Sequence, residues 1–235
     1  MNKSLIKFYV SFNKHTIVGD TLQSTHNDKL IILHGAGKAS RERYSSFRNC
    51  IFKHHSISTI AFDMVGHGET GGYLNESSLK QRTDQVITVV DHLNIPEPLS
   101  IMGTSMGGYT AIKLTKFFKI KNLILVVPGI YHHCAYSIQF DNSFSKIIRQ
   151  NNSWLQSDAF DLLESFTGKL LLISAEFDDV IPKGVIEGIV KSTEHLDIRE
   201  HYSIQDSSHL IFNFLNKNKK ELELFTSIIS RFLNK

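Results

Sequence analysis

The stretch IMGTSMGGYT, residues 101–110, places one serine among glycines, and the residues around it indicate how the chain folds. Residues 99–104 form a nearly all-apolar run that suits a buried strand. Residues 108–118 repeat apolar side chains every three to four positions, as a helix packed on a sheet does. Ser105 therefore falls in a sharp turn between a strand and a helix.

The glycines of this turn indicate that the serine is chemically reactive. Gly103 and Gly107 lack the Cβ atoms that would collide in so tight a reversal. Such a turn lifts the serine oxygen above the sheet edge and aims the backbone N–H of Met106, at the start of the helix, toward the same space. We interpret Ser105 as a nucleophile with one oxyanion-hole donor beside it. The alternative is a tight turn whose small residues serve packing alone.

The rest of the chain alternates buried strands with amphipathic helices. Apolar runs typical of strands buried on both faces of a parallel sheet occur at residues 30–34, 58–64, 99–104, 122–128 and 169–174. Helical periodicity separates them at residues 41–55, 79–93 and 108–118. An antiparallel strand pair is predicted at residues 5–12 and 16–22, a last strand at 197–204, and a closing helix at 220–233. This pattern predicts an α/β fold with a doubly wound, mostly parallel central sheet and flanking helices.

Length and composition favour one domain. With 235 residues, 41% of them hydrophobic, the chain can build one sizeable core, so we expect a single domain over residues 1–235. Residues 129–168 separate two predicted strands by far more than a usual connection. We interpret this segment as a short lid or cap insertion within the domain.

Charge and hydropathy give no sign of a nucleic-acid or membrane partner. The chain carries 26 Lys+Arg against 23 Asp+Glu, a net charge of +3, which does not indicate binding to nucleic acid or to an anionic membrane. Polar residues interrupt the apolar positions near the amino terminus, and no later run reaches membrane-spanning length. We therefore expect a cytoplasmic protein without a membrane span; a homodimer is left open.

The cysteines and a histidine pair give no clear ligand pattern. Cys50 and Cys134 lie far apart without the spacing of a disulfide framework or a structural zinc site, which favours two small buried side chains. The adjacent His132 and His133 could contact a polar leaving group or bind a metal, but we favour solvated side chains. We therefore expect no cofactor and no metal ion.

A serine nucleophile requires a base and an acid that orients the base. Among the 12 histidines, His209 follows the last predicted strand, which places it at the same carboxyl edge of the sheet as Ser105. Asp178 and Asp179 follow the strand at residues 169–174 and reach that edge as well. The alternatives are a solvated loop histidine and, for the aspartates, a turn or helix cap, to which we assign Asp179. Asp178 is the predicted acid.

Four motifs in this order resemble the α/β-hydrolase superfamily, and within it the lid-bearing serine hydrolases that include monoacylglycerol lipases, carboxylesterases and the serine aminopeptidase-like group. They are HGAG at residues 34–37, DMVGHGET at 63–70, GTSMGG at 103–108, and EFDDVIP at 176–182 with SSH at 207–209. In that family the acid commonly precedes a hydrophobic residue and a proline, which here selects Asp178. The resemblance also implies that Ala36, or as a second choice Gly37, supplies the other oxyanion-hole N–H and that His67 belongs to a structural turn without a catalytic role.

These residues predict a serine hydrolase that cleaves carboxylic esters of small to medium acyl substrates through an acyl-enzyme. An acyl-thioesterase or acyltransferase is the alternative, and a non-catalytic binding protein with this fold is a weaker one. A serine at the elbow argues against dehalogenase and epoxide hydrolase chemistry, which attack through a carboxylate. Aromatic side chains of the insertion could line an apolar acyl pocket or form the small core of the insertion itself: Tyr131, Phe140, Phe144, Trp154 and Phe160.

Overall fold

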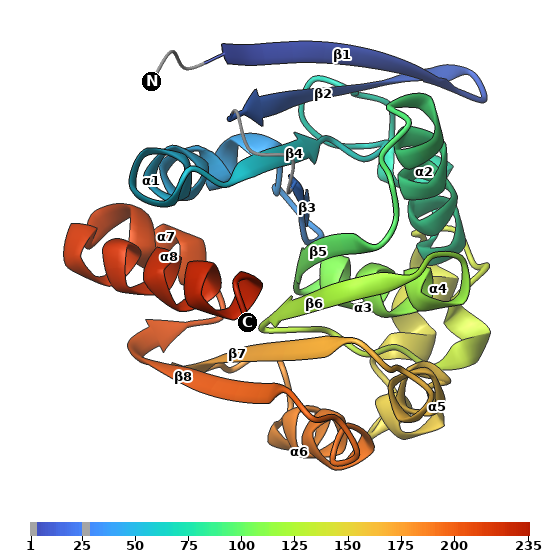
Figure 1. The fold of residues 1–235 in the computed structure, drawn as a ribbon. Helices are drawn as coiled ribbons and strands as arrows, with labels where there is room; N and C mark the ends of the chain where they lie inside the picture. Colours follow the sequence, from blue (N-terminus) through green and yellow to red (C-terminus); the bar gives the residue numbers. More distant parts are fainter. Residues whose placement is uncertain (1–3, 25–28) are drawn as a thin grey trace.

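The computed structural model describes residues 4–24 and 29–235, and within them an eight-stranded sheet forms the centre of the molecule (Figure 1). The strands are β1 Ser4–Phe12, β2 His15–Gln23, β3 Lys29–Leu33, β4 Ser58–Phe62, β5 Leu99–Thr104, β6 Ile120–Val126, β7 Lys169–Phe177 and β8 Arg199–Ser208. Their order across the sheet is β1-β2-β4-β3-β5-β6-β7-β8. β2 pairs antiparallel with β1 and β4, and the remaining neighbours pair in parallel. The predicted mostly parallel sheet with an antiparallel pair at its start is confirmed.

Helices cover both faces of this sheet. They are α1 Ser45–His55, α2 Leu79–His92, α3 Met106–Lys113, α4 Asn142–Ile148, α5 Ala159–Glu164, α6 Lys183–Ser192, α7 Ile211–Lys217 and α8 Lys219–Leu233. Figure 1 shows α1, α7 and α8 on one side of the sheet and α2, α3, α5 and α6 on the other. The chain is therefore doubly wound, as predicted.

The all-apolar strand sequences follow from this two-sided covering. Along β3, Ile31 and Leu33 pack into the core beneath α2 and α3, while Leu30 and Ile32 pack into the core beneath α1 and α8. Successive side chains of a strand point to opposite faces, so a strand covered on both sides needs apolar residues at every position. This explains why the parallel strands read as continuous runs rather than as alternating patterns.

Two predicted helices differ in detail from the observed ones. The helix expected at residues 41–55 begins with a separate 3-10 turn, Arg41–Tyr44, before α1. The helix expected at residues 108–118 already begins at Met106 and ends in a 3-10 turn, Leu114–Lys116. The early start follows from the reversal at Ser105, which leaves the next residue in helical conformation.

Residues 129–168 connect β6 to β7 with α4, α5 and two short 3-10 turns, His133–Ala135 and Ser153–Gln156. The buried apolar side chains of this insertion, among them Phe144 and Leu163, belong to the core on the α2 and α3 side of the sheet. Within the described part of the chain, the helices are all too short or too polar to cross a bilayer.

Candidate active site

Ser105 stands in a backbone conformation that few residues with a side chain adopt. Ser105 lies between the end of β5 and the start of α3, and its φ is 52° and its ψ is −120°. The Ser105 N–H donates to the carbonyl of Val126 at 3.0 Å, and the Ser105 carbonyl accepts the N–H groups of Gly108 at 2.8 Å and Gly129 at 3.0 Å. Three backbone hydrogen bonds therefore hold a conformation that costs on the order of 1–3 kcal/mol.

Two glycines allow the backbone to pass this point. A Cβ on Gly103 would lie 2.2 Å from the carbonyl oxygen of Gly107, and a Cβ on Gly107 would lie 2.3 Å from that of Leu33. Both distances are far below van der Waals contact with backbone atoms that have no room to move. The predicted reason for these glycines, collision at a tight reversal, is confirmed, and β3 and β5 both approach the start of α3 at this point.

The structure brings Ser105, His209 and Asp178 together in one hydrogen-bonded row. The Ser105 Oγ lies 3.0 Å from Nε2 of His209, and Nδ1 of His209 lies 3.0 Å and 3.1 Å from the two carboxylate oxygens of Asp178. Ser105 follows β5, Asp178 follows β7 and His209 follows β8, so the three residues meet where parallel strands end. Asp179 is exposed to solvent.

The loop after β7 presents Asp178 to the imidazole. Its Oδ1 accepts the backbone N–H groups of Val180 and Ile181, both at 2.9 Å. Burial alone raises the pKa of Asp178, but the hydrogen bond from His209 and the two backbone N–H groups outweigh it and lower the pKa below its ordinary value. An ionised carboxylate only accepts hydrogen bonds, so Nδ1 of His209 carries the proton. The lone pair of Nε2 then faces the serine hydroxyl.

The loop after β3 comes close to this row. A Cβ on Gly35 would lie 3.1 Å from the Cβ of Ser105, which shows how near the backbone passes. The Gly35 carbonyl accepts the Nδ1–H of His34 at 2.7 Å, and Nη2 of Arg82 lies 3.5 Å from it. Because C=O and N–H point in opposite directions across a trans peptide, the N–H of the exposed Ala36 points away from these two donors.

Arg82 is a fully buried residue that the sequence interpretation missed. Its Nη2 donates to the carbonyl of His34 through a short hydrogen bond, whereas Nε and Nη1 have no hydrogen-bond partner among the described residues. Burial lowers the pKa of Arg82 to about 10, which still leaves it protonated at neutral pH. The sequence held a signal: Arg82 stands at helical spacing between Leu79 and Val86, on the face that packs against the sheet.

Two buried histidines beside the site are neutral scaffold residues. His34 Nε2 accepts the Met64 N–H at 3.0 Å, and the His34 and His67 rings lie 4.6 Å apart. Burial, followed by the nearby Arg82 charge, lowers the pKa of His34 well below its ordinary value and that of His67 to about 4. This agrees with the structural role expected of His67.

The aromatic residues expected to line an acyl pocket mostly contact one another. The ring centroids of Phe140 and Phe144 are 4.9 Å apart, those of Tyr131 and Phe144 are 6.0 Å apart, and those of Trp154 and Phe160 are 6.1 Å apart. The same rings belong to the core beneath α2 and α3 or pack against it, so they do not form a separate core of the insertion. A substrate pocket lined by the same residues stays a prediction.

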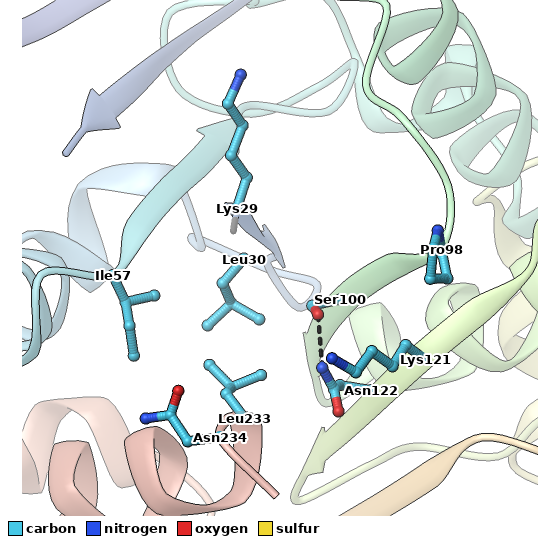
Figure 2. A pocket seen from close by; sticks show the side chains of 9 residues that line it. All are labelled: Lys29, Leu30, Ile57, Pro98, Ser100, Lys121, Asn122, Leu233 and Asn234. Atoms are coloured by element: carbon cyan, nitrogen blue, oxygen red, sulfur yellow. Dashed lines mark hydrogen bonds between the residues drawn. The ribbon is translucent and has the colours of Figure 1, made fainter. Parts of the chain in front are cut away.

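A separate pocket lies at the opposite edge of the sheet, where β3, β5 and β6 begin (Figure 2). It is lined by Leu30, Pro98 and Leu233 among others, and the Asn122 amide donates to the Ser100 hydroxyl across it at 2.8 Å. Ser105 stands at the carboxyl end of β5, so this pocket is not part of the serine site.

One expectation about the cysteines is wrong. Cys50 is half-buried, but Cys134 is exposed, because it sits on the solvent-facing 3-10 turn His133–Ala135 that opens the insertion. His133 is exposed beside it and His132 is half-buried.

The fold and the order of its motifs define an α/β-hydrolase, and the profile of the serine aminopeptidase S33 family matches residues 24–157. The chain therefore belongs to this family of hydrolases.

Known proteins share part of the sequence or the fold of this chain. An (E)-2-((N-methylformamido)methylene)succinate hydrolase from Acinetobacter baylyi is 26% identical over 128 residues, 49% of this chain and 47% of that protein. An esterase from Exiguobacterium antarcticum superposes with a TM-score of 0.72 at 16% identity, covering 95% of this chain and 99% of the esterase. A Pyrococcus furiosus esterase gives a TM-score of 0.70 at 17% identity, covering 99% and 92%. The chain spans less than half the length of the curated relatives it matches first, 22% and 47%.

The neutral histidines generate a prediction about stability in acid. The pKa of His67 is 6.5 in an unfolded chain and about 4 in the folded one, so the unfolded state binds the proton first. The associated stability is complete above pH 6.5 and is lost as the pH falls toward 4, by up to about 3 kcal/mol. Urea unfolding at pH 7, 5.5 and 4.5 should show a smaller loss for His67→Gln than for the wild type. The exposed His92→Gln serves as control and should behave as the wild type; an equal loss in all three proteins contradicts the prediction.

Proposed function

We propose that this protein hydrolyses carboxylic esters of small to medium acyl substrates through an acyl-enzyme. The observation that carries the proposal is the unbroken row of hydrogen bonds from the Ser105 hydroxyl through His209 to the Asp178 carboxylate. A serine alone is a weak nucleophile, and this row provides both the base that takes its proton and the acid that fixes the base's tautomer.

The proposed steps follow from the protonation states. Ser105 Oγ attacks the carbonyl carbon of the ester while its proton passes to Nε2 of His209, and Asp178 stabilises the resulting imidazolium. The tetrahedral intermediate collapses, the bond to the alcohol breaks, and His209 returns the proton to the leaving oxygen. Water then attacks the acyl-enzyme with His209 as base, which releases the acid and restores Ser105.

The oxyanion is assigned to the N–H groups of Met106 and Ala36. Met106 is the first residue of α3, and the first N–H groups of a helix have no partner within it. The Ala36 N–H points away from His34 and Arg82 because these two hold the Gly35 carbonyl on the other side of the same peptide. The positive charge of Arg82 also polarises this peptide and strengthens its N–H as a donor.

The insertion at residues 129–168 is proposed as a lid within a single catalytic domain. Its first residue, Gly129, donates to the Ser105 carbonyl, so the segment leaves the sheet directly beside the nucleophile. An apolar acyl group would be bound between this segment and the carboxyl edge of the sheet. A thioester is the alternative substrate, since the same acyl-enzyme forms from it.

A substrate panel tests the proposal. We expect the wild type to hydrolyse p-nitrophenyl esters of two to eight carbons faster than matched acyl-thioesters, and Ser105→Ala to lose at least about a thousandfold in kcat. A fluorophosphonate should label the wild type and not the Ser105→Ala variant, whose folding is checked by circular dichroism. Faster turnover of thioesters would favour the thioesterase alternative. The absence of both turnover and labelling would refute the proposal that the protein is an enzyme.

Two adjacent aspartates offer a matched pair. Asp178→Asn retains a hydrogen-bonding side chain but turns the wrong His209 tautomer toward the serine, so kcat should fall on the order of a thousand- to ten-thousandfold. Asp179→Asn makes the same chemical change one residue away, on an exposed side chain, and should leave kcat nearly unchanged. Equal losses, or the reverse order, would overturn the assignment of the acid.

The buried arginine yields a further prediction. Arg82→Met removes the donor to the His34 and Gly35 carbonyls, so kcat should fall about ten- to a hundredfold with little change in KM, because the displaced peptide contacts the oxyanion only in the transition state. Affinity for a trifluoromethyl ketone should fall in parallel. Lys80→Met, an exposed change on the same helix, is the control. A folded Arg82→Met variant with wild-type kcat would show that Arg82 has no part in positioning this loop.

A further inference from the structure

Three side chains with metal-binding atoms converge where the insertion begins. His132, His133 and Cys134 each offer a ligand atom, and these atoms all lie within 4.8 Å of one another. The Cys134 Sγ already lies 3.3 Å from Nε2 of His133, and the two imidazole rings are 4.7 Å apart. Of the three residues, His133 and Cys134 are exposed, so an ion in solution can reach them.

The hydrogen bonds of the two histidines determine which ring nitrogens carry lone pairs. His133 Nδ1 lies 2.7 Å from the Gln156 carbonyl, which can only accept, so Nδ1 carries the proton and Nε2 the lone pair. The Cys134 backbone N–H donates to His132 Nδ1 at 3.0 Å, so that nitrogen carries the lone pair of its ring. His133 Nε2 therefore faces the Cys134 thiol, and His132 Nδ1 faces the Cys134 backbone N–H.

The surroundings of His133 resemble those of a metal ligand. A coordinating histidine usually donates its second ring N–H to a carbonyl or carboxylate, which fixes the ring and raises its basicity. The bond from His133 to Gln156 does this here. Gln156 ends the 3-10 turn Ser153–Gln156, so this bond also links the first part of the insertion to its second half.

We propose that His132, His133 and Cys134 form a site for one zinc ion. Two imidazoles and a thiolate are the donor set that favours zinc over magnesium or calcium. Tetrahedral zinc places its nitrogen and sulfur ligands about 3.3–3.6 Å apart, which the Cys134–His133 pair already satisfies. The remaining separation closes by rotation of side chains at the surface.

When zinc binds, each of the three ligand side chains gives up its present proton or hydrogen bond. The Cys134 thiol releases its proton to solvent, and the lone pairs of His133 Nε2 and His132 Nδ1 are donated to the zinc ion. The Cys134 backbone N–H then loses its acceptor on His132 and donates to water instead. A water molecule completes the four ligands. The bound ion fixes the His133 ring, whose Nδ1–H donates to the Gln156 carbonyl, and so holds the start of the insertion against that turn. The zinc proposal does not depend on the proposed ester chemistry.

Cobalt titration of the 235-residue chain tests the site, because Co²⁺ occupies zinc sites and absorbs when bound to thiolate. We expect a thiolate-to-cobalt band together with tetrahedral cobalt bands, both displaced by one equivalent of Zn²⁺. Cys134→Ser should abolish the thiolate band, while Cys50→Ser, which changes the other cysteine, should retain it. His132→Gln and His133→Gln should each weaken cobalt binding at least about tenfold.

Three results would overturn the site. One is the absence of any thiolate band at millimolar cobalt in a reduced, folded protein. A second is a band that persists at equal affinity in both histidine variants, which would mean that a single cysteine binds the ion with solvent ligands only. A third is loss of the band in Cys50→Ser but not in Cys134→Ser.

Discussion

The conformation of Ser105 is the constraint on which the rest of the site depends. A φ of 52° with a ψ of −120° is accessible here because Gly103 and Gly107 leave the space behind the turn to backbone atoms alone. The same absence of Cβ atoms lets α3 start within contact distance of the Leu33 carbonyl at the end of β3. Backbone packing thereby brings Ser105, the first N–H groups of α3 and the loop after β3 to one place.

The parallel strands bring residues that are far apart in the chain to the same place as Ser105. Ser105 and His209 are 104 residues apart, yet their side chains are 3.0 Å apart because β5 and β8 end at the same edge of one sheet. Asp178 reaches the same edge from β7, and the hydrogen bond from His209, together with two backbone N–H groups of its own loop, lowers the pKa of the carboxylate despite burial. The electrostatics of the site thus depend on loop geometry as much as on residue type.

A buried positive charge is the least expected component. The hydrogen bonds of Arg82 within the described residues go to backbone carbonyls rather than to a carboxylate, and two of its nitrogens lack hydrogen-bond partners there. Such a charge is costly to bury unless carbonyl dipoles compensate it. The carbonyls of His34 and Gly35 supply those dipoles, so the cost of burying Arg82 is tied to the position of the loop beside Ser105. The neutral state of His34 and His67 avoids adding further positive charge to the same region.

The sequence by itself determined the layered fold and the three candidate site residues. Apolar runs, helical periodicity and turn glycines are local properties that can be recognised along the chain without a structure. The sequence indicated Ser105, His209 and Asp178 through their places after predicted strands. Only the tertiary structure decided which ring nitrogen faces which partner, that Arg82 rather than an apolar residue lies beneath the loop after β3, and that the aromatic rings of the insertion pack on one another. It also decided that Cys134 lies at the surface, with His133 Nε2 facing its thiol and His132 Nδ1 facing its backbone N–H. These features depend on distances between side chains from different elements, and residue spacing along the chain does not encode such distances.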